Sequence, residues 1–358
     1  MDRPDICIAG AGIIGLSLAL ELHRRGASVT VLDQGPPLAQ ASTAAAGMLA
    51  AHDPDNPQQL HNLAELSLSL YPNYLAQLHE LSGIQVFFQT ASTLQALPPH
   101  VPPWPVELAA ETLVLLLPNL NPGNHRFVLL KEQSLDPRDL AAALLAAVRA
   151  TTIDLRPHTP VRILRSVPEA VEIHSSTGTL HAAKFVDCTG AWALSAPALP
   201  HKYIKPKKGQ MLAVPLPQDL PLHLVVRTPD TYVVPRTLGQ SMGRAIIGST
   251  IEDAGFDKTV QPSDIASLLC RAADLLPGLA DAPVLESWAG LRPATQDGLP
   301  LLGAIPNLPN QFLAIGHYRN GILLAPGTAH VMAQLINGES PSIDLSPFSP
   351  ARLPQPNL

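Results

Sequence analysis

Short runs of apolar residues, bounded by glycine or polar residues, predict the buried strands of this chain. Residues 6–9 form such a run directly before a glycine-rich turn, and the apolar positions of residues 13–25 suit a helix. Gly26 follows, where a left-handed residue commonly ends a helix. Residues 28–33 then have the pattern of a second strand. The pattern predicts a strand–helix–strand unit of about 30 residues, the length of a nucleotide-binding crossover.

The same rules predict further elements along the chain. Asp136-Pro137-Arg138 begins an Ala/Leu-rich helix that runs to about residue 150. A proline-rich stretch, residues 201–262, contains alternating segments at 232–234 and 245–247, which indicate an antiparallel sheet with one covered face. The other predicted elements are strands at 161–164, 171–174, 180–186 and 313–316, a helix at 262–276 with Ser263 as its cap, and a final helix from Leu324 onward with Pro326 in its first turn.

The composition indicates a folded protein with a sizeable core. Of the 358 residues, 46% are hydrophobic and 15% are charged, which disfavours long-range disorder. The length is typical of two domains or of one large α/β unit. A net charge of −6, from 23 basic and 29 acidic residues, disfavours a nucleic-acid partner. The 38 prolines indicate rigid loops, and the tail after Ser340 is expected to be loosely ordered.

The cysteines and the N-terminal residues predict a soluble, cytoplasmic protein without a membrane partner. Cys7, Cys188 and Cys270 lie far apart, with no histidine at ligand spacing, so we expect neither disulfides nor a metal site. The apolar run near the N-terminus is interrupted by glycines and is too short to span a bilayer. It also follows acidic residues, whereas a secretory signal begins with basic ones.

The glycine-rich turn is the first motif that indicates chemistry. It reads Gly10-Ala11-Gly12-Ile13-Ile14-Gly15, and Asp33 ends the second strand about 20 residues later. The glycines let the backbone approach a pyrophosphate, and the helix N-terminus supplies positive potential. Asp33 is suited to accept hydrogen bonds from an adenosine ribose. The motif predicts a dinucleotide site but does not distinguish FAD from NAD.

Two further segments each have a structural and a functional interpretation. Ala41-Ser42-Thr43-Ala44-Ala45-Ala46-Gly47-Met48 is either a tightly packed helix start or a segment against a cofactor, where only small side chains fit. Val186-Asp187-Cys188-Thr189-Gly190-Ala191-Trp192 is either an ordinary strand exit or a backbone that passes close to a nucleotide. Spacing alone leaves both questions open.

Two C-terminal segments each place an arginine among glycines and apolar residues. They are AGLRPATQDGLP, which contains Arg292, and GHYRNGILLAPGTA, which contains Arg319. A desolvated guanidinium is costly unless it is paired, so each arginine has either a ligand anion or an internal Asp or Glu as its partner. The final helix would direct its positive N-terminal end toward the loop 316–321.

Together these motifs resemble the glycine/D-amino-acid oxidase family of FAD-dependent oxidoreductases, and within it the glycine oxidases of thiamine biosynthesis. The likeness runs from the first strand to about residue 337. It implies an α/β (α+β) fold, in which a Rossmann-like FAD-binding domain is interleaved with a substrate-binding domain built on an antiparallel β-sheet. The implied ranges are 1–80, 135–200 and 286–345 for FAD, 81–134 and 201–285 for substrate, and 346–358 for a tail.

The resemblance implies which residues hold FAD. Backbone groups of Ile13 and Ile14 would contact the pyrophosphate, and Asp33 with Gln34 would hold the ribose. Relatives that attach FAD covalently use a Cys near the C-terminal loop or a His in the small-residue segment, and both are missing here, so FAD is expected to be non-covalent. The other implied FAD contacts are Gly10, Gly12, Gly15, Ala41, Ser42, Ala46, Gly47, Met48, Val161, His317, Tyr318, Arg319, Asn320, Gly321, Ile322 and Leu323.

The resemblance also implies the reaction. Arg292 would bind the substrate carboxylate, with Tyr232 as a second donor and Arg319 at the edge of the site. Hydride transfer from glycine, sarcosine or a D-amino acid to the flavin would be followed by reduction of O2 to H2O2 and release of an oxo acid and ammonia or amine, a product suited to thiamine biosynthesis. His317 is interpreted as structural, and the rate is expected to rise with pH because the substrate amine must be neutral. Substrate size depends on variable positions such as Asp230 and Ile251.

Three alternatives to the oxidase remain at this stage. One is a D-amino-acid dehydrogenase that passes electrons to quinone or another carrier. Another is the flavin domain of a tRNA-modifying transferase, which the acidic charge disfavours. The third is a non-catalytic dinucleotide sensor, which would leave Arg292 and Tyr232 without a ligand. Homo-oligomers are common in the family, so a homo-oligomer is an expected state.

Overall fold

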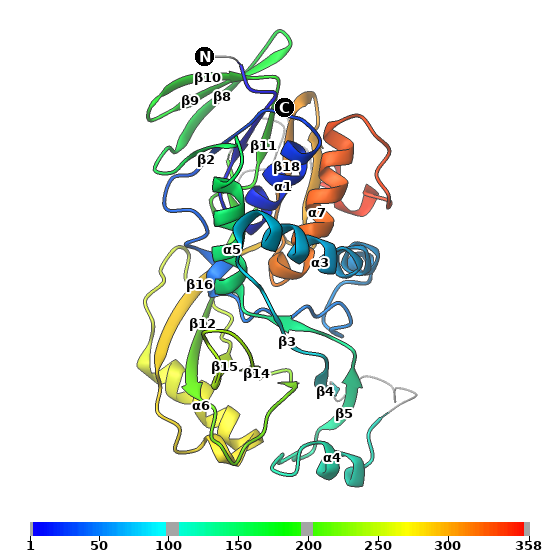
Figure 1. Cartoon of the computed structure of the whole chain (residues 1–358), viewed down its shortest axis with the longest axis vertical. Helices are drawn as coiled ribbons and strands as arrows, with labels where there is room; N and C mark the ends of the chain where they lie inside the picture. Colours follow the sequence, from blue (N-terminus) through cyan, green and yellow to red (C-terminus); the bar gives the residue numbers. More distant parts are fainter. Residues whose placement is uncertain (1–2, 98–106, 195–202, 354–358) are drawn as a thin grey trace.

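The computed structural model describes residues 3–97, 107–194 and 203–353 (Figure 1). In the orientation of Figure 1, a six-stranded sheet with its helices forms the upper part of the molecule, and a seven-stranded sheet forms the lower part. The long strands β12 (Lys205–Pro215) and β16 (Glu286–Ala294) lie in the lower sheet and extend toward the upper part. The predicted α/β fold class is confirmed.

The upper sheet is parallel except at one edge. Its strand order is β17-β18-β11-β1-β2-β7, and only β17 runs antiparallel to its neighbour. All four residues of β1 are buried, as expected for a parallel strand covered on both faces. The bounds are β1 (Ile6–Ala9), β2 (Val29–Leu32), β7 (Asp154–Arg156), β11 (Lys184–Asp187), β17 (Leu301–Ile305) and β18 (Leu308–Ile315).

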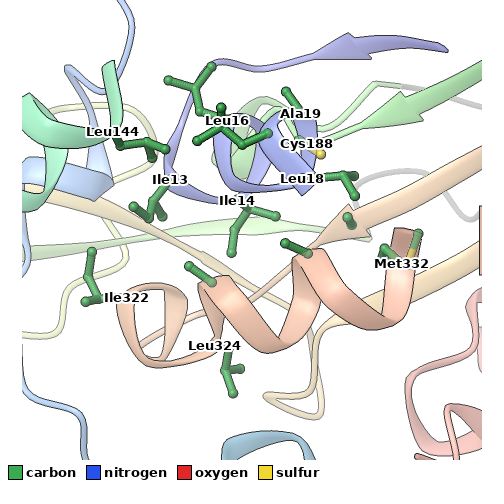
Figure 2. Close-up of a cluster of buried hydrophobic side chains, with 14 of the residues drawn as sticks. Ile13, Ile14, Leu16, Leu18, Ala19, Leu144, Cys188, Ile322, Leu324 and Met332 are labelled. Carbon is green, nitrogen blue, oxygen red and sulfur yellow. The ribbon is translucent and has the colours of Figure 1, made fainter. Parts of the chain in front are cut away.

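Four helices build the main hydrophobic core of this part. They are α1 (Ile13–Arg24), α3 (His61–Ser82), α5 (Pro137–Arg149) and α7 (Gly321–Ile336). Figure 2 shows this core, in which Ile14 of α1, Leu144 of α5 and Met332 of α7 belong to one buried cluster. As predicted, Gly26 is left-handed, with φ of 91°, just after α1, and the Asp136 side chain caps α5.

The lower sheet is antiparallel except between two neighbouring strands. Its order is β16-β12-β15-β14-β13-β4-β5, and β13 runs parallel to β4. Helix α6 (Pro262–Leu275) covers one face, where its Leu268 joins Leu212 and Ile247 in a second buried cluster. The other bounds are β4 (Thr93–Leu97), β5 (Arg126–Leu130), β13 (Val225–Arg227), β14 (Tyr232–Arg236), β15 (Arg244–Gly248) and the short helix α4 (Ala110–Leu116).

Smaller elements complete the structure. A three-stranded antiparallel sheet contains β8 (Val161–Val167), β9 (Ala170–Ser175) and β10 (Gly178–Ala182), and β3 (Phe88–Thr90) pairs with β6 (Ser134–Leu135). The short helical turns are α2 (Ala41–Ala44), η1 (Gln58–Leu60), η2 (Gly190–Trp192), η3 (Pro277–Leu279), η4 (Ser346–Phe348) and η5 (Pro350–Arg352). Among the residues described, no helix combines the length and the apolar character needed to cross a bilayer.

Several predicted boundaries differ from the structure. The single strand predicted at 180–186 is two strands, because β10 pairs with β9 whereas β11 pairs with β1 and β18. Helix α6 is preceded by Gln261 and starts with Pro262, so Ser263 lies inside the helix and is not its cap. The FAD-binding range predicted from residue 286 begins with β16, and this strand pairs with β12 in the lower sheet.

The prediction of a loosely ordered tail is wrong as far as residue 353. Phe348 is only 1% exposed and belongs to the main core. The Arg352 guanidinium binds the Asp297 carboxylate at 2.8 Å and donates to the Leu299 carbonyl at 2.8 Å. One aromatic anchor and one ion pair therefore hold this proline-rich segment against the upper part.

The final helix begins earlier than predicted, and its hydrogen bonding is interrupted. Since α7 starts at Gly321, Pro326 lies in its second turn rather than its first. Proline has no N–H to donate to the carbonyl four residues earlier, and the buried Tyr71 hydroxyl of α3 donates to that Ile322 carbonyl instead, at 2.5 Å. The Ser67 hydroxyl donates to the Leu323 carbonyl at 2.6 Å and accepts from the amide of Gly327 at 3.0 Å.

Candidate active site

Two adjoining cavities lie where the carboxyl ends of β1, β11 and β18 face the lower sheet. Their volumes are about 250 Å³ and about 130 Å³. In open α/β sheets, ligands bind in the crevice outside these strand ends. Because the cavities share lining residues, they form one elongated site. The shared residues are Gly12, Ala41, Ser42, Cys188, Gly190 and Pro293.

The glycine-rich turn packs closely against the end of β11. Gly10 has φ of 102°, and a Cβ atom there would lie 2.3 Å from the Cys188 carbonyl oxygen. Gly15 lines neither cavity, and a Cβ atom there would lie 1.9 Å from the Gly10 carbonyl oxygen. The amide of Ile13 donates to the Ser42 hydroxyl at 2.9 Å. The turn therefore brings the N-terminus of α1 and a hydroxyl to the junction of the two cavities.

The smaller cavity contains the residues predicted to hold an adenosine. The Asp33 carboxylate accepts from the amides of Ala11 at 2.6 Å and Gly35 at 2.8 Å, so it is fixed in place at the end of β2. Trp192 also lines this cavity, and its ring lies 5.5 Å from the ring of Phe256, centroid to centroid. The predicted residues that line it are Gly10, Gly12, Asp33, Gln34, Ala41, Ser42 and Val161.

The small-residue segment forms a helical turn and also part of the cavity wall. It contains the short helix α2 and also lines the larger cavity through Ala41, Ser42, Ala46, Gly47 and Met48. The Trp288 indole donates to the Ala44 carbonyl at 3.0 Å, and the buried Arg236 donates to the Ala46 carbonyl at 2.9 Å. Gly47 has φ of 86°, and a Cβ atom there would lie 1.9 Å from the Leu135 carbonyl oxygen. Larger side chains would neither pack here nor leave the cavity open.

Arg292 lies in the larger cavity without a carboxylate partner among the residues described. Its Nη2 donates to the Ser249 hydroxyl at 2.7 Å, and its Nη1 donates to the Thr250 carbonyl at 3.1 Å. The guanidinium lies against Gly209, where a Cβ atom would be 2.3 Å from both terminal nitrogens. Burial is the largest effect on the Arg292 guanidinium and lowers its pKa, and the opposing effects of Tyr232, Tyr318 and the more distant Glu252 carboxylate are weaker. The internal-acid alternative therefore does not hold for this arginine.

Tyr232 lines the same cavity from β14. Its hydroxyl donates to the Met211 sulfur at 3.1 Å, a weak acceptor. The ring end lies over Gly248 of β15, where a Cβ atom would be 2.4 Å from the hydroxyl. A stronger acceptor that enters the cavity can therefore accept a hydrogen bond from the Tyr232 hydroxyl, and only the weak bond to sulfur is lost.

Arg319 has internal acid partners, unlike Arg292. Its guanidinium lies 3.2 Å from the Asp53 carboxylate and 3.5 Å from that of Asp55. Asp53 also lies 3.8 Å from the buried Arg227, which pairs with Glu132 at 3.0 Å. The sequence analysis did not identify this cluster, because its members are separated by long stretches of chain and no motif connects them.

The C-terminal loop forms the remaining wall of the larger cavity. Burial lowers the pKa of His317 to about 3, and its Nε2 lies 3.0 Å from the Thr328 hydroxyl. The imidazole is therefore neutral near pH 7, in agreement with a structural role. The predicted loop residues that line the cavity are His317, Tyr318, Arg319, Asn320, Gly321 and Ile322, whereas Leu323 is buried in the core.

Asp187 is a further structural residue that sequence reasoning did not identify. It ends β11, and its carboxylate accepts from the Thr189 amide at 2.9 Å, the Thr189 hydroxyl at 2.6 Å and the Leu194 amide at 2.9 Å. Burial is the largest effect on this carboxyl and raises its pKa. These bonds shape the turn that carries Gly190 into the site. Only the aspartate at the end of a predicted strand could have suggested this role.

Comparisons with known proteins agree with this geometry. Residues 5–335 match the DAO family model, described as FAD dependent oxidoreductase. The chain is 36% identical to a bifunctional protein ThiO/ThiG of Trichormus variabilis over 97% of its own length, but it spans only 55% of that relative. It is 33% identical to a glycine oxidase of Geobacillus kaustophilus, over 98% of this chain and 97% of the relative. The crystal structure of glycine oxidase from Geobacillus kaustophilus superimposes with a TM-score of 0.87 at 31% identity, covering 98% of this chain and 99% of that one.

Proposed function

The chain belongs to the DAO family of FAD-dependent oxidoreductases, and on this basis we propose that it oxidises glycine or a related small amino acid or amine, such as sarcosine or a D-amino acid. Molecular oxygen is the proposed electron acceptor, and hydrogen peroxide, an oxo acid and ammonia or an amine are the products. Relatives named glycine oxidase favour this reaction over the dehydrogenase and transferase alternatives.

The observation that carries the proposal is the state of Arg292. The Arg292 guanidinium is half-buried and largely desolvated in the cavity, and it has no carboxylate within ion-pair distance in the described chain, so an anion is its favoured ligand. A planar guanidinium binds a carboxylate through two parallel hydrogen bonds, which also orient the ligand. Tyr232, on β14 of the same sheet, can donate a further hydrogen bond into the cavity. This donor set fits the acid end of an amino acid.

The residues around the two cavities fit FAD. The N-terminus of α1 and the Ser42 hydroxyl would hold the pyrophosphate, and Asp33 with Gln34 would hold the ribose. The small-residue segment and the loop 317–322 would flank the flavin ring. A Cβ atom at Gly10 of the glycine-rich turn or at Gly47 of the small-residue segment would collide with backbone, so the shape of both cavity walls depends on glycine. No covalent link is proposed.

The protein's part in the reaction is to orient the substrate and to stabilise charge. FAD held by these residues would supply a hydride acceptor and a route for the electrons to molecular oxygen. Arg292 and Tyr232 hold the substrate carboxylate and so align the Cα–H bond. Helix α7 begins at Gly321 in the cavity wall, and its N-terminus stabilises negative charge there. His317 is neutral and bonded to Thr328, so the substrate must arrive with a neutral amine, and turnover should rise with pH.

The test uses the purified FAD-loaded protein. We expect glycine or a related amine to bleach the flavin absorbance anaerobically, and hydrogen peroxide to form in proportion to amine consumed in air. Arg292→Ala should raise the KM for glycine about 100-fold or more, since charge-assisted hydrogen bonds are lost. A protein whose flavin is bleached by the amine but which makes no peroxide would be a dehydrogenase. An unchanged KM for glycine in Arg292→Ala would refute the role of Arg292 in binding the carboxylate.

The cellular setting is part of the proposal. The free thiols of Cys7, Cys188 and Cys270 suit a reducing compartment such as the cytoplasm. A relative that combines ThiO with ThiG in one chain supports a link to thiamine biosynthesis. The homo-oligomer stays a prediction, and size-exclusion chromatography with light scattering would test it.

A further inference from the structure

The two shortest hydrogen bonds of Arg292 go to one short segment of chain, residues 249–252, which we call the clamp segment. The Ser249 hydroxyl and the Thr250 carbonyl accept two of the guanidinium hydrogen bonds, at 2.7 and 3.1 Å. A longer contact of 3.4 Å joins Nη1 to the Lys208 carbonyl on β12. The direction in which the free N–H groups of Arg292 point therefore depends on where this segment lies.

Glu252 attaches the clamp segment to β12 through its backbone. Its amide donates to the Lys208 carbonyl at 3.0 Å, and the Lys208 amide donates to the Glu252 carbonyl at 3.0 Å. This pair of bonds is an isolated antiparallel bridge outside the named strands. The same Lys208 carbonyl also contacts Arg292, so the bridge lies directly beside the guanidinium.

The side chain of Glu252 reinforces this attachment with both oxygens. Oε1 accepts from the Thr250 hydroxyl and from Gln210 Nε2, the latter at 2.8 Å. Oε2 lies 3.1 Å from the ammonium of Lys208, whose side chain is only 2% exposed. The Glu252 carboxylate thus contacts Thr250, whose carbonyl accepts from Arg292. It also contacts two buried side chains of β12, those of Lys208 and Gln210.

The cluster continues into helix α6. Gln210 is fully buried, donates to the Asp264 carboxylate at 2.5 Å and accepts from the Gln261 amide at 2.6 Å. Its backbone amide donates to the Thr250 hydroxyl at 2.8 Å. The clamp segment is therefore fixed against a strand and a helix at once, although it has no regular secondary structure of its own.

We propose that Glu252 is a positioning residue for Arg292: it fixes residues 249–252 on β12 so that the guanidinium presents its free donors to the substrate carboxylate. The inference rests on the proposed function, because it assumes that Arg292 binds a carboxylate. Glu252 does not line either cavity, so it acts through the clamp segment and not by contact with the substrate.

The test must separate the hydrogen bonds of Glu252 from its charge. Removing Glu252 alone leaves the buried Lys208 ammonium without a counter-charge, which can prevent folding. We therefore use two double variants in which Lys208→Met removes that charge. Lys208→Met/Glu252→Gln retains an oxygen acceptor for Thr250 and Gln210, whereas Lys208→Met/Glu252→Ala removes it. The two variants carry the same charge, and they differ in whether residue 252 has a side-chain amide that can accept these hydrogen bonds.

The primary measurement is the Kd of acetate for the FAD-loaded protein, followed by the change in flavin absorbance. The Gln double variant should bind acetate within about threefold of the wild type, and the Ala double variant about tenfold more weakly, the equivalent of one hydrogen bond. In the Ala double variant the KM for glycine should rise by the same factor while kcat and the Kd of FAD change little. If Glu252 had a purely structural role, the Ala double variant would instead have a lower melting temperature or a weaker affinity for FAD, without a selective rise in the KM for glycine.

A matched control and two outcomes complete the design. Asp253→Asn removes the neighbouring exposed pair between Asp253 and Lys207, 2.5 Å apart, and should leave acetate binding unchanged. If Arg292→Ala loses acetate binding while Lys208→Met/Glu252→Ala keeps wild-type affinity, the Glu252 proposal alone is overturned. If Arg292→Ala itself binds acetate normally, the clamp is refuted and the role of Glu252 with it.

Discussion

The Tyr71 hydroxyl donates a 2.5 Å hydrogen bond to the Ile322 carbonyl, the acceptor that an amide at position 326 would use in a regular helix. Pro326 occupies the position that would normally supply the donor. A side chain of α3 therefore replaces a backbone bond of α7, just behind the loop that lines the larger cavity. Hydrogen bonds from α3 side chains therefore support the start of α7, where its own backbone hydrogen bonding is interrupted.

Tyr71→Phe is expected to lower the free energy of unfolding by about 1–3 kcal/mol, the usual cost of a buried carbonyl without a partner. The residue is fully buried, so water cannot replace the hydroxyl. Urea unfolding of the FAD-loaded protein would measure the change. As a control, Ser69→Ala on the exposed face of α3 should have almost no effect. Equal stability of Tyr71→Phe and wild type would show that the bond to Ile322 contributes nothing.

His317 should contribute to the pH dependence of stability. Burial lowers its pKa from 6.5 to about 3 in the folded protein. As the pH falls through this window, the unfolded chain takes up a proton that the folded chain cannot, so the free energy of unfolding falls by up to about 1.4 kcal/mol per pH unit. His317→Gln should remove this part of the slope, whereas His79→Gln on the exposed side of α3 should not. Parallel slopes for all three proteins would contradict the assignment.

Arg319 and Arg292 should respond differently to substitution. Arg319 pairs with Asp53 and Asp55 and is about one-third exposed, so its ion pairs contribute little. We expect Arg319→Ala to change the KM for glycine by less than about tenfold, against about 100-fold or more for Arg292→Ala. Steady-state kinetics of the two variants side by side would decide. A larger loss in Arg319→Ala would move the carboxylate site to the C-terminal loop.

The ring of Phe256 should slow the loss of FAD. It lies 5.5 Å from Trp192, which lines the smaller cavity, and Lys258 on the same loop donates to Gln40 at 2.9 Å. Phe256→Ala should release FAD several times faster on dilution, seen as rising flavin fluorescence. Met242→Ala, at another exposed apolar position, should not.

Acid precipitation should release all the FAD from every variant, and flavin that stays with the protein would disprove non-covalent binding.

The features that sequence predicted well are those set by neighbouring residues. The glycine-rich turn, the Gly26 helix end and the Asp136 cap each depend on a few consecutive positions, and the structure has all three. The start of α7 was misplaced because Pro326 is tolerated only through hydroxyls from α3. The ordered tail depends on Phe348, a single aromatic residue that the polar context concealed.

The partners of the two arginines show the limit of motif reasoning. Both lie among glycines and apolar residues, and the sequence left an internal acid open for either. Arg319 pairs with Asp53, which lies 266 positions away in the chain, whereas Arg292 contacts a hydroxyl and carbonyls. Pairings over such separations depend on how the two sheets meet, which local patterns do not encode.

The bridge between Ala294 and His317 joins the end of β16 to the loop along the cavity. Arg292 lies two residues before that bridge, so the bridge connects the proposed carboxylate-binding residue to the cavity wall that residues 317–322 form. Their separation cannot stretch to suit the ligand. The site should therefore select substrates by the distance between the carboxylate and the carbon that bears the nitrogen. We expect it to accept amino acids with the nitrogen on the carbon next to the carboxylate. It should reject β-alanine, in which an extra methylene moves the reacting carbon along the ring.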